Sequence, residues 1–527
     1  MVEEGKSKLF ILKPITDRMP AVTRPEGHVH FRTKMLWTAF ILILYFVMCN
    51  VLIYGLSSNS LDVFSEFRAI MAGASGSLMH LGIGPIVTAS IIMQLFTGAK
   101  IIKLDLKKTE DKSIYQGTQK LLVIIMIVVE SVPQVYGYLM PDSAFVSKLN
   151  GTFGGNGMLM ANLAIILQLC IGSYIVFLMD EVVSKWGIGS GISLFIAAGV
   201  AEAVFTGTLN WMPINTNAPL SVGGGDVSAN LPVGTLPKTI YLLQHMSSSD
   251  LTRGGYETMM LQQPNPILAL ISTICIFFIV AYLESSRLEL PLAHGKVRGA
   301  RGRYPIRLIY ASNIPVILMS ALLANVSMFS ILFWSHPSLS RIPLIGHQWW
   351  IGGYEVGATT PSTGGAWYLS RVNGVQDWLL PLMNPDRYSY YMMGHEYYQV
   401  LLHLIVYVGI MVLGSIVFAK FWIATTNMGP EAVAKQIQSS GLQIPGFRRD
   451  PRVLRKILER YIPAVTVISG AFVGGIAAGA DLFGTVGDTS GTGVLLAVGI
   501  VINLYEAIGK EQMVEMHPVL RGFFGEQ

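Results

Sequence analysis

Charged residues are scarce in this chain of 527 residues, where Asp, Glu, Lys and Arg together make up 13%. Soluble domains typically carry about 25% charged residues. Hydrophobic residues reach 52%, and the mean hydropathy is +0.51. This surplus of apolar surface needs a solvent other than water, and lipid is the obvious one. The composition therefore excludes an ordinary soluble domain.

Cysteine is also scarce. The three cysteines, Cys49, Cys170 and Cys275, lie inside apolar runs, and none belongs to a CxxC pair. Spacing typical of metal ligands is missing, so the sequence predicts no disulfide framework, no metal site and no cofactor. We expect no cleavable signal peptide, because the first thirty residues are mixed and charged and the first apolar run is long enough to span.

What the sequence does contain is a series of apolar runs near twenty residues, the length that crosses a bilayer. Ten such runs predict ten transmembrane helices, at 35–56, 81–96, 121–139, 159–179, 188–205, 266–283, 308–333, 400–423, 462–480 and 493–508. The second is short and interrupted by glycine, and the fifth begins in a glycine-rich stretch. Short or broken spans usually line a cavity. The predicted fold class is an all-α membrane protein.

The basic residues decide the orientation. With the N-terminus inside, all but seven of the 37 lysines and arginines fall on the inner side. A skew of that size satisfies the positive-inside rule and supports an even number of spans, with both termini cytoplasmic. The seven on the outer side are Arg68, Lys148, Lys238, Arg253, Arg341, Arg371 and Arg387.

These spans divide the chain into parts. Residues 1–34 form a cytoplasmic amphipathic segment, 35–205 a first half of five spans, 265–508 a second half, and 509–527 a cytoplasmic tail. Two inverted five-helix halves are compatible with this pattern. The long loops are 206–264 and 334–398 outside, and 284–307 and 424–461 inside.

The outer loops have different characters. The first contains one amphipathic stretch at 238–246, and residues 334–398 are rich in aromatics, including Trp349, Trp350, Trp367 and Tyr368. Most of these aromatics are interpreted as membrane-interface residues. The alternative is a pair of short surface or re-entrant helices that caps an outer vestibule.

Two motifs resemble catalytic or nucleotide-binding patterns, but each lacks the residues that such a site needs. Residues 73–76 match a G-x-S-G nucleophile pattern, but a nucleophilic serine needs a base and an oxyanion hole, and a small-residue turn is the simpler interpretation. The glycines at 187–191 have neither a preceding strand nor an acidic ribose partner, which argues against a nucleotide site. An aspartyl mechanism fails as well, because Asp481 and Asp488 are expected in a loop. The sequence predicts no enzyme.

Polar residues inside the spans are few. Glu130 lies in the middle of the third span, where a carboxylate is costly and favours an internal contact over exposure to lipid. Thr88 and Asn325 are milder cases, for which hydrogen bonding between helices is the simplest role. The two inner loops are long and basic, and on charge alone they fit topology signals near anionic lipid and a dock for a polyanion equally well.

Several strings together resemble one family. They are LGIGPIVTA at 81–89, GIGSGISLFI at 187–196, YPIRL at 304–308, SNIPVIL at 312–318 and GTGVLL at 491–496. In this order and on these spans they are similar to the SecY family, the central alpha subunit of the Sec protein-translocation channel, in its archaeal and eukaryotic-like branch. The resemblance implies an hourglass pore through the centre of the ten helices.

The resemblance also implies roles for particular residues. The apolar pore ring would be Ile83, Val87, Ile192, Ile196, Ile317 and Leu496. A short plug helix at about 62–77 would include Ala69, Ala72, Gly73 and Ser75. Thr88, Glu130 and Asn325 would form the polar cluster of the lateral gate. The ribosome-binding arginines would be Arg287, Arg298, Arg301, Arg303, Arg448 and Arg449.

Function and partners follow as expectations. The family implies a passive channel for unfolded polypeptides in the plasma membrane, which also releases hydrophobic segments sideways into lipid. Its partners would be a small SecE-type gamma subunit, a beta subunit, the ribosome through its RNA, signal sequences and nascent chains. The alternative is a secondary transporter of small solutes. Such a transporter should place charged ligands at the midplane of several spans. The pore-ring positions here are aliphatic, which favours the channel.

Overall fold

The computed structural model describes most of the chain. The residues outside the described part are 1–7, 17, 28, 58–70, 100, 103, 105–107, 214–220, 223–224, 227–230, 251, 253–254, 262, 295–300, 311–312, 337–339, 343–345, 347, 356–359, 393, 427, 440–441, 444–450, 488 and 517–527. Plug residue Ala69 and the arginines at 298, 448 and 449 therefore lie outside it. For Arg301 and Arg303 only the backbone is described.

Within the described part of the chain, ten apolar helices form the bundle, one at each predicted span. They are α2 (Phe31–Cys49), α4 (Gly84–Gly98), α5 (Thr109–Gly137), α7 (Gly157–Trp186), α8 (Gly191–Leu209), α12 (Ile267–Ser285), α13 (Ile314–Ser335), α17 (Tyr397–Thr425), α19 (Pro451–Phe483) and α20 (Gly491–Met516). Nine of them are long and apolar enough to cross a membrane, and α4 is shorter, with 15 residues. Helices are suited to lipid because their backbone hydrogen bonds are satisfied within the helix. The prediction of a ten-helix membrane protein is confirmed.

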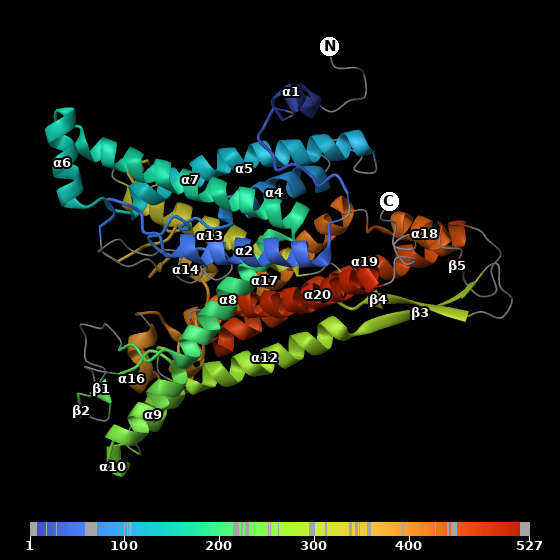
Figure 1. The fold of residues 1–527 in the computed structure, drawn as a ribbon. Coiled ribbons are helices and arrows are strands. Elements are labelled where there is room, and N and C mark those ends of the chain that lie inside the picture. The colour runs from blue at the N-terminus through green and yellow to red at the C-terminus, as the bar shows by residue number, and fades with distance from the viewer. Residues whose placement is uncertain are drawn as a thin grey trace.

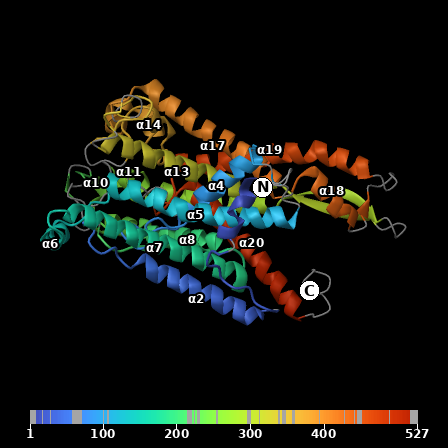
Figure 2. The same cartoon turned by 90° about the horizontal axis from the view of Figure 1, so that it is seen from above.

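Figure 1 shows these helices running side by side, with the connecting elements gathered at two ends. One end, which we call the hairpin end, carries the strands β3 (Arg287–His294), β4 (Arg301–Arg307) and β5 (Leu442–Gln443) and the helix α18 (Pro430–Ser439). In Figure 2, α2 lies along one edge of the bundle and α17 along the opposite edge.

The opposite end holds most of the remaining short elements. They are α6 (Ser143–Phe153), β1 (Ser221–Val222), β2 (Gly225–Asp226), α9 (Thr235–His245), α10 (Ser248–Asp250), α11 (Tyr256–Met260), α14 (Gly365–Leu369), α15 (Leu379–Met383), α16 (Pro385–Tyr388) and η5 (Ser389–Met392). The amphipathic stretch predicted at 238–246 lies largely within α9. The long outer loops thus consist in part of short helices.

The two halves of the chain meet along two seams. One is formed by α8 against α20, and the other by α4 and α5 against α13, with α17 packed beside α4. A single large apolar cluster fills the interior between them and draws residues from both halves. The second seam is the one that contains the polar residues predicted for a gate.

Short strands at the hairpin end were not predicted. Strand β3 pairs antiparallel with β4 on one side and with β5 on the other. The pairing brings the two basic loops, 284–307 and 424–461, into one three-stranded sheet. The second loop is also shorter than predicted, because α19 begins at Pro451 and α18 occupies Pro430–Ser439. These strands lie outside the spanning helices, so the helical fold class stands.

The N-terminal segment is short helix followed by extended chain. It contains η1 (Lys8–Leu12) and α1 (Lys13–Thr16), which pack against α5. Beyond them, Glu181 at the end of α7 accepts a hydrogen bond from the Val22 amide at 2.9 Å and forms ion pairs with Lys120 and Lys185. The segment is therefore fixed to α5 and α7 by charge-assisted contacts, which are stronger than neutral hydrogen bonds.

Candidate functional site

The six aliphatic residues predicted for a pore ring come from four helices and the turn before one of them. Ile83 directly precedes α4, and the others lie on α4, α8, α13 and α20. All six belong to the same apolar cluster. Ile83, Ile196 and Leu496 are fully buried, Val87 is 5% exposed, and Ile192 and Ile317 are partly buried. The structure therefore places residues up to 413 positions apart in one aliphatic core.

The segment before α4 packs tightly under this core. The Ile83 amide donates a 2.7 Å hydrogen bond to the Met71 carbonyl, and Ala72 is 1% exposed. Gly73 is half-buried and Ser75 is exposed. The predicted helix at 62–77 does not extend through its described part, because Ala72 has a φ of +49° and residues 73–77 are not helical, with Ser77 in a β-bridge to Leu52. A left-handed residue ends a helix, so the helical boundary expected at residue 77 is wrong.

The serine of the G-x-S-G pattern has no catalytic arrangement. Its nearest histidine in sequence, His80, is 2% exposed and accepts a hydrogen bond at Nδ1 from the Gly76 amide at 3.0 Å. In a serine triad this nitrogen would contact the orienting carboxylate, and here it accepts from a backbone amide instead. The turn interpretation of residues 73–76 fits this geometry.

A direct contact joins the two sides of the α4–α13 seam. Asn325 Nδ2 on α13 donates a hydrogen bond to Thr88 Oγ1 on α4 at 3.0 Å, and a second one to the Ala321 carbonyl of its own helix. Thr88 Oγ1 in turn lies 3.0 Å from the Gly84 carbonyl, which accepts its proton. Two residues that are 237 positions apart are thereby linked across the seam.

Glu130 completes the group from α5. This side chain is 4% exposed, and its Oε1 has no hydrogen-bond partner among the described residues. A Cβ at Gly84 would lie 3.0 Å from Glu130 Oε2, so the carboxylate fills the space that this glycine leaves. Thr88 has one hydroxyl proton, which the Gly84 carbonyl accepts, while Asn325 donates to the hydroxyl oxygen. The structure brings together all three residues predicted for the gate.

One seam residue escaped the sequence prediction. Gln134 lies one turn after Glu130 on α5, is 2% exposed, and its Nε2 is 3.9 Å from Met328 Sδ on α13. The i, i+4 spacing from Glu130 places both on one face of the helix. That spacing was the signal in the sequence that pointed to it.

The basic residues at the hairpin end are arranged by strand register. Arg287 pairs with Arg307 at the root of the hairpin, while Arg301 and Arg303 lie opposite Ala293 and Pro291. Arg301 and Arg303 are two positions apart and therefore share one face of β4. Because β5 pairs with β3 at Ala293 and His294, the chain that leads to the arginines at 448 and 449 starts from the same sheet.

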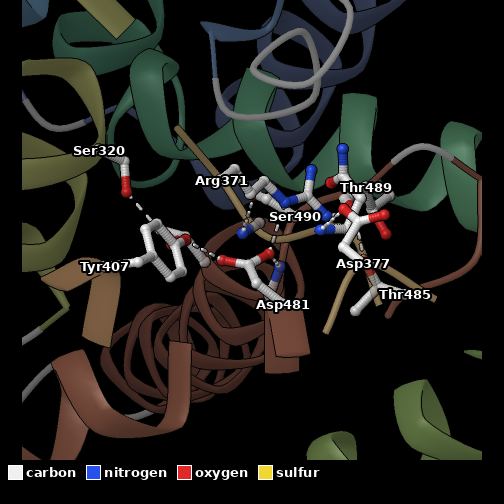
Figure 3. A network of polar contacts seen from close by, with 12 residues as sticks. Ser320, Arg371, Asp377, Tyr407, Asp481, Thr485, Thr489 and Ser490 are labelled. Atoms are coloured by element: carbon white, nitrogen blue, oxygen red, sulfur yellow. Dashed lines mark hydrogen bonds and ion pairs between the residues drawn. The ribbon is translucent and has the colours of Figure 1, made fainter. Parts of the chain in front are cut away.

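A buried ion pair at the opposite end corrects one sequence prediction. Asp481, expected in a loop, lies inside α19 and is 1% exposed. Arg371, counted as an outer topology residue, has its Nε 2.7 Å from Asp481 Oδ1 and its side chain 6% exposed. Figure 3 shows the two side chains facing each other, with Tyr407 on the far side of the carboxylate. A long apolar run followed by a lone aspartate was the signal in the sequence.

Both oxygens of the Asp481 carboxylate have partners. Oδ1 also accepts the Gly491 amide at 2.7 Å, and Oδ2 accepts the Tyr407 hydroxyl at 2.6 Å. Arg371 Nη2 donates to the Thr489 carbonyl at 2.7 Å. One carboxylate thereby joins the outer loop, α17, α19 and the first residue of α20, the helix that carries Leu496. Buried charges persist when their hydrogen-bonding capacity is satisfied in this way.

The aromatic residues of the second outer loop divide into two groups. Trp349 and Trp350 are exposed, as membrane-interface residues would be. Trp367 is buried, with its ring centroid 3.8 Å from that of His395 in a stacked arrangement and 4.4 Å from that of His403. For Trp367 the interface interpretation is therefore wrong, and its ring belongs to the packing of α14 on α17.

These features together define a class of protein: a polytopic membrane protein whose two halves enclose an aliphatic centre and meet at a polar seam. Residues 77–505 match the SecY family, and residues 43–76 match the plug domain of Sec61p. The protein translocase subunit SecY of Archaeoglobus fulgidus is 43% identical over 522 residues, covering 99% of this chain and 99% of that protein. SecY of Haloferax volcanii is 44% identical over 522 residues, covering 98% and 99%.

Comparison with solved structures supports the same family. A protein conducting channel matches with a TM-score of 0.75 and 36% identity, covering 96% of this chain and 98% of the other. Sec61 in the canine ribosome–channel complex from the endoplasmic reticulum matches with a TM-score of 0.72 at 36% identity and the same coverage. This chain belongs to the SecY family and is a protein-conducting channel subunit. The family and function expected from the sequence are confirmed, and the relatives give no support to a small-solute transporter.

Proposed function

We propose that this chain conducts unfolded polypeptides through its centre and releases hydrophobic segments sideways through the α4–α5/α13 seam. The observation that carries this proposal is the gathering of Ile83, Val87, Ile192, Ile196, Ile317 and Leu496 into one aliphatic core from both halves. A collar of such side chains yields to a passing chain and resists ions by dewetting. The chain acts as a passive conduit and catalyses no reaction.

The seam contact supports the second part of the proposal. The hydrogen bond from Asn325 to Thr88, with Glu130 beside it, stabilises the closed arrangement of α4, α5 and α13. Polar contacts between helices in lipid are modest, about 0.6 kcal/mol on average. A hydrophobic signal segment that partitions into the seam can therefore offset their loss. Residues from about 62 to 77, including Ala69, Ala72, Gly73 and Ser75, act as the plug.

The hairpin end docks a polyanion, which we propose is ribosomal RNA. The sheet that unites the two basic loops supports this role, because β4, which contains Arg301 and Arg303, and β5, which precedes Arg448 and Arg449 in the chain, flank the same strand β3. Arg298 lies in the same hairpin sequence. Lys and Arg contacts to phosphates dominate affinity for nucleic acids. The Sec61 relative in a ribosome–channel complex supports the same partner.

The remaining partners and the location belong to the same proposal. A small SecE-type gamma subunit and a beta subunit complete the channel, which sits in the plasma membrane. The hairpin end faces the cytoplasm, and so do both termini. The excess of lysine and arginine in the inner loops supports this orientation.

Crosslinking tests the conducting path. A photoreactive residue at position 83, 192 or 317 should form adducts with a nascent chain stalled midway through translocation. The matched control is position 271, because Ile271 is on α12 and 51% exposed on the bundle surface. Absence of adducts at all three ring positions, together with uptake of a small solute by vesicles that hold the channel, would contradict the proposal.

A further inference from the structure

The root of the β3–β4 hairpin sets two like charges against each other. Arg287 begins β3 directly after α12, and Arg307 ends β4, and the two are register partners on adjacent antiparallel strands. Like charges directly opposite one another destabilise a strand pair. A counter-charge placed between the two arginines would offset this repulsion where the strands leave the membrane helices.

Glu506 on α20 supplies that counter-charge. Its Oε2 forms an ion pair with Arg307 Nη2, and its Oε1 lies 3.6 Å from Arg287 Nη2. Asn503, one turn earlier on α20, accepts a 3.0 Å hydrogen bond from Arg307 Nη1. Residues three apart share a helix face. Two residues on one face of α20 therefore hold the ends of both strands.

A buried contact continues this attachment toward the membrane. Asn313, at the start of α13, donates a 2.8 Å hydrogen bond to Glu284, in the last turn of α12. Both are mostly buried against α20, where a Cβ at Gly499 would lie 2.0 Å from Asn313 Nδ2. The residues at 499, 503 and 506 follow one stripe of α20. Both points at which the hairpin segment leaves the bundle are therefore fixed to the same stripe.

We propose that Glu506 is a positioning residue, which holds the basic hairpin at a fixed angle to α20 and so presents its distal arginines to the ribosome. This inference rests on the proposed docking function. It also changes the role of Arg287: this side chain belongs to the root and pairs with Glu506, and the phosphate contacts fall to the arginines further along the loops. An exposed ion pair contributes little by itself, so the effect of Glu506 is on geometry rather than on global stability.

The test compares two substitutions that remove the same charge from the same helix. Glu506→Gln releases the hairpin root, whereas Glu511→Gln breaks only the 2.7 Å ion pair with Lys34 of α2. Full-length channel in lipid nanodiscs is titrated with ribosomes at several salt concentrations. If Glu506 acted only through its charge, both variants would bind the polyanion more tightly. Positioning predicts that Glu506→Gln binds at least threefold more weakly while Glu511→Gln does not.

A second measurement does not depend on the ribosome. Amide hydrogen exchange across residues 287–294 and 301–307 should accelerate at least fivefold in Glu506→Gln and stay unchanged in Glu511→Gln. Equal ribosome affinities for the two variants, or unchanged exchange in the hairpin, would overturn the proposal. If the wild-type channel binds no ribosomes, the docking function fails, and hydrogen exchange alone then decides whether Glu506 holds the hairpin.

Discussion

Arg371 and Asp481, which are 110 positions apart, form an ion pair of 2.7 Å at the end of the bundle opposite the hairpin. The pair is nearly inaccessible to solvent, and its carboxylate also binds the Tyr407 hydroxyl and the Gly491 amide. It fixes the outer loop to the beginning of α20. Because α20 carries Leu496 of the proposed ring, this anchor connects the outer loop to the centre of the channel.

Loss of the anchor should destabilise the protein. Asp481→Asn leaves the Arg371 charge buried without its counter-charge, and breaking a buried pair in this way costs about 3–5 kcal/mol. Chemical denaturation in detergent micelles measures the change. The matched control is Glu459→Gln, whose partner Arg455 is on the exposed surface of α19. We expect no measurable change there, and equal loss in both variants would refute a special role for Asp481.

The seam contact should bias the gate toward its closed state. Asn325→Ala removes the hydrogen bond to Thr88, and an average membrane hydrogen bond of about 0.6 kcal/mol corresponds to roughly a threefold shift in the open-to-closed ratio. Pulsed electron resonance between spin labels on α4 and α13 reports that ratio. The control is Thr466→Ala, because the Thr466 hydroxyl bonds the Ile462 carbonyl of its own helix. A distance distribution identical to that of the wild type would show that the contact does not hold the seam.

The aliphatic core should be the ion barrier of the resting channel. Replacing Ile192 and Ile317 together with glycine removes two side chains that narrow a dewetted constriction, so ion conductance in planar bilayers should rise. Glycine at Ile271 and Ile274, which are exposed on α12, makes the same change on the outer surface of the bundle. Equal conductance in the two double variants would argue against the ring assignment.

Lys238, at the end of the bundle opposite the hairpin, should make the stability of the protein depend on pH. Burial in α9 lowers the pKa of its amine from 10.5 to about 8, and its Nζ donates a 2.7 Å hydrogen bond to the Pro264 carbonyl. Between pH 8 and 10.5 the unfolded chain binds more protons than the folded chain, so stability should increase with pH in this window, by up to about 3 kcal/mol. Below pH 8 both the folded and the unfolded chain bind the proton, so this gain in stability is absent there.

Thermal unfolding from pH 7 to 10.5 checks this expectation. Other groups titrate over the same range, so the informative quantity is the difference between the wild type and Lys238→Met, a side chain of similar length that carries no proton. The stability of the wild type relative to Lys238→Met should increase as the pH rises. Parallel pH profiles for the two proteins would show that Lys238 does not carry the effect.

The sequence by itself determined the number of spans and their positions, because crossing lipid is a local requirement on about twenty consecutive residues. It also indicated which loops share a side, because topology follows the lysines and arginines beside each span. The residues of the ring and the gate came from short strings that resemble the SecY family. Each of these features can be recognised from neighbouring residues alone.

Only the tertiary structure decided which distant residues meet. Asn325 and Thr88 are 237 positions apart, and their side-chain types allow many partners. Asp481 looked like a loop residue because a charge usually ends an apolar run, yet it lies in the last turn of α19 and pairs there with Arg371 of the outer loop. The sheet that unites the two basic loops likewise depends on β5 reaching β3 across the hairpin end. Helix formation in lipid is local, whereas ion pairs, seams and strand pairing depend on how the helices pack.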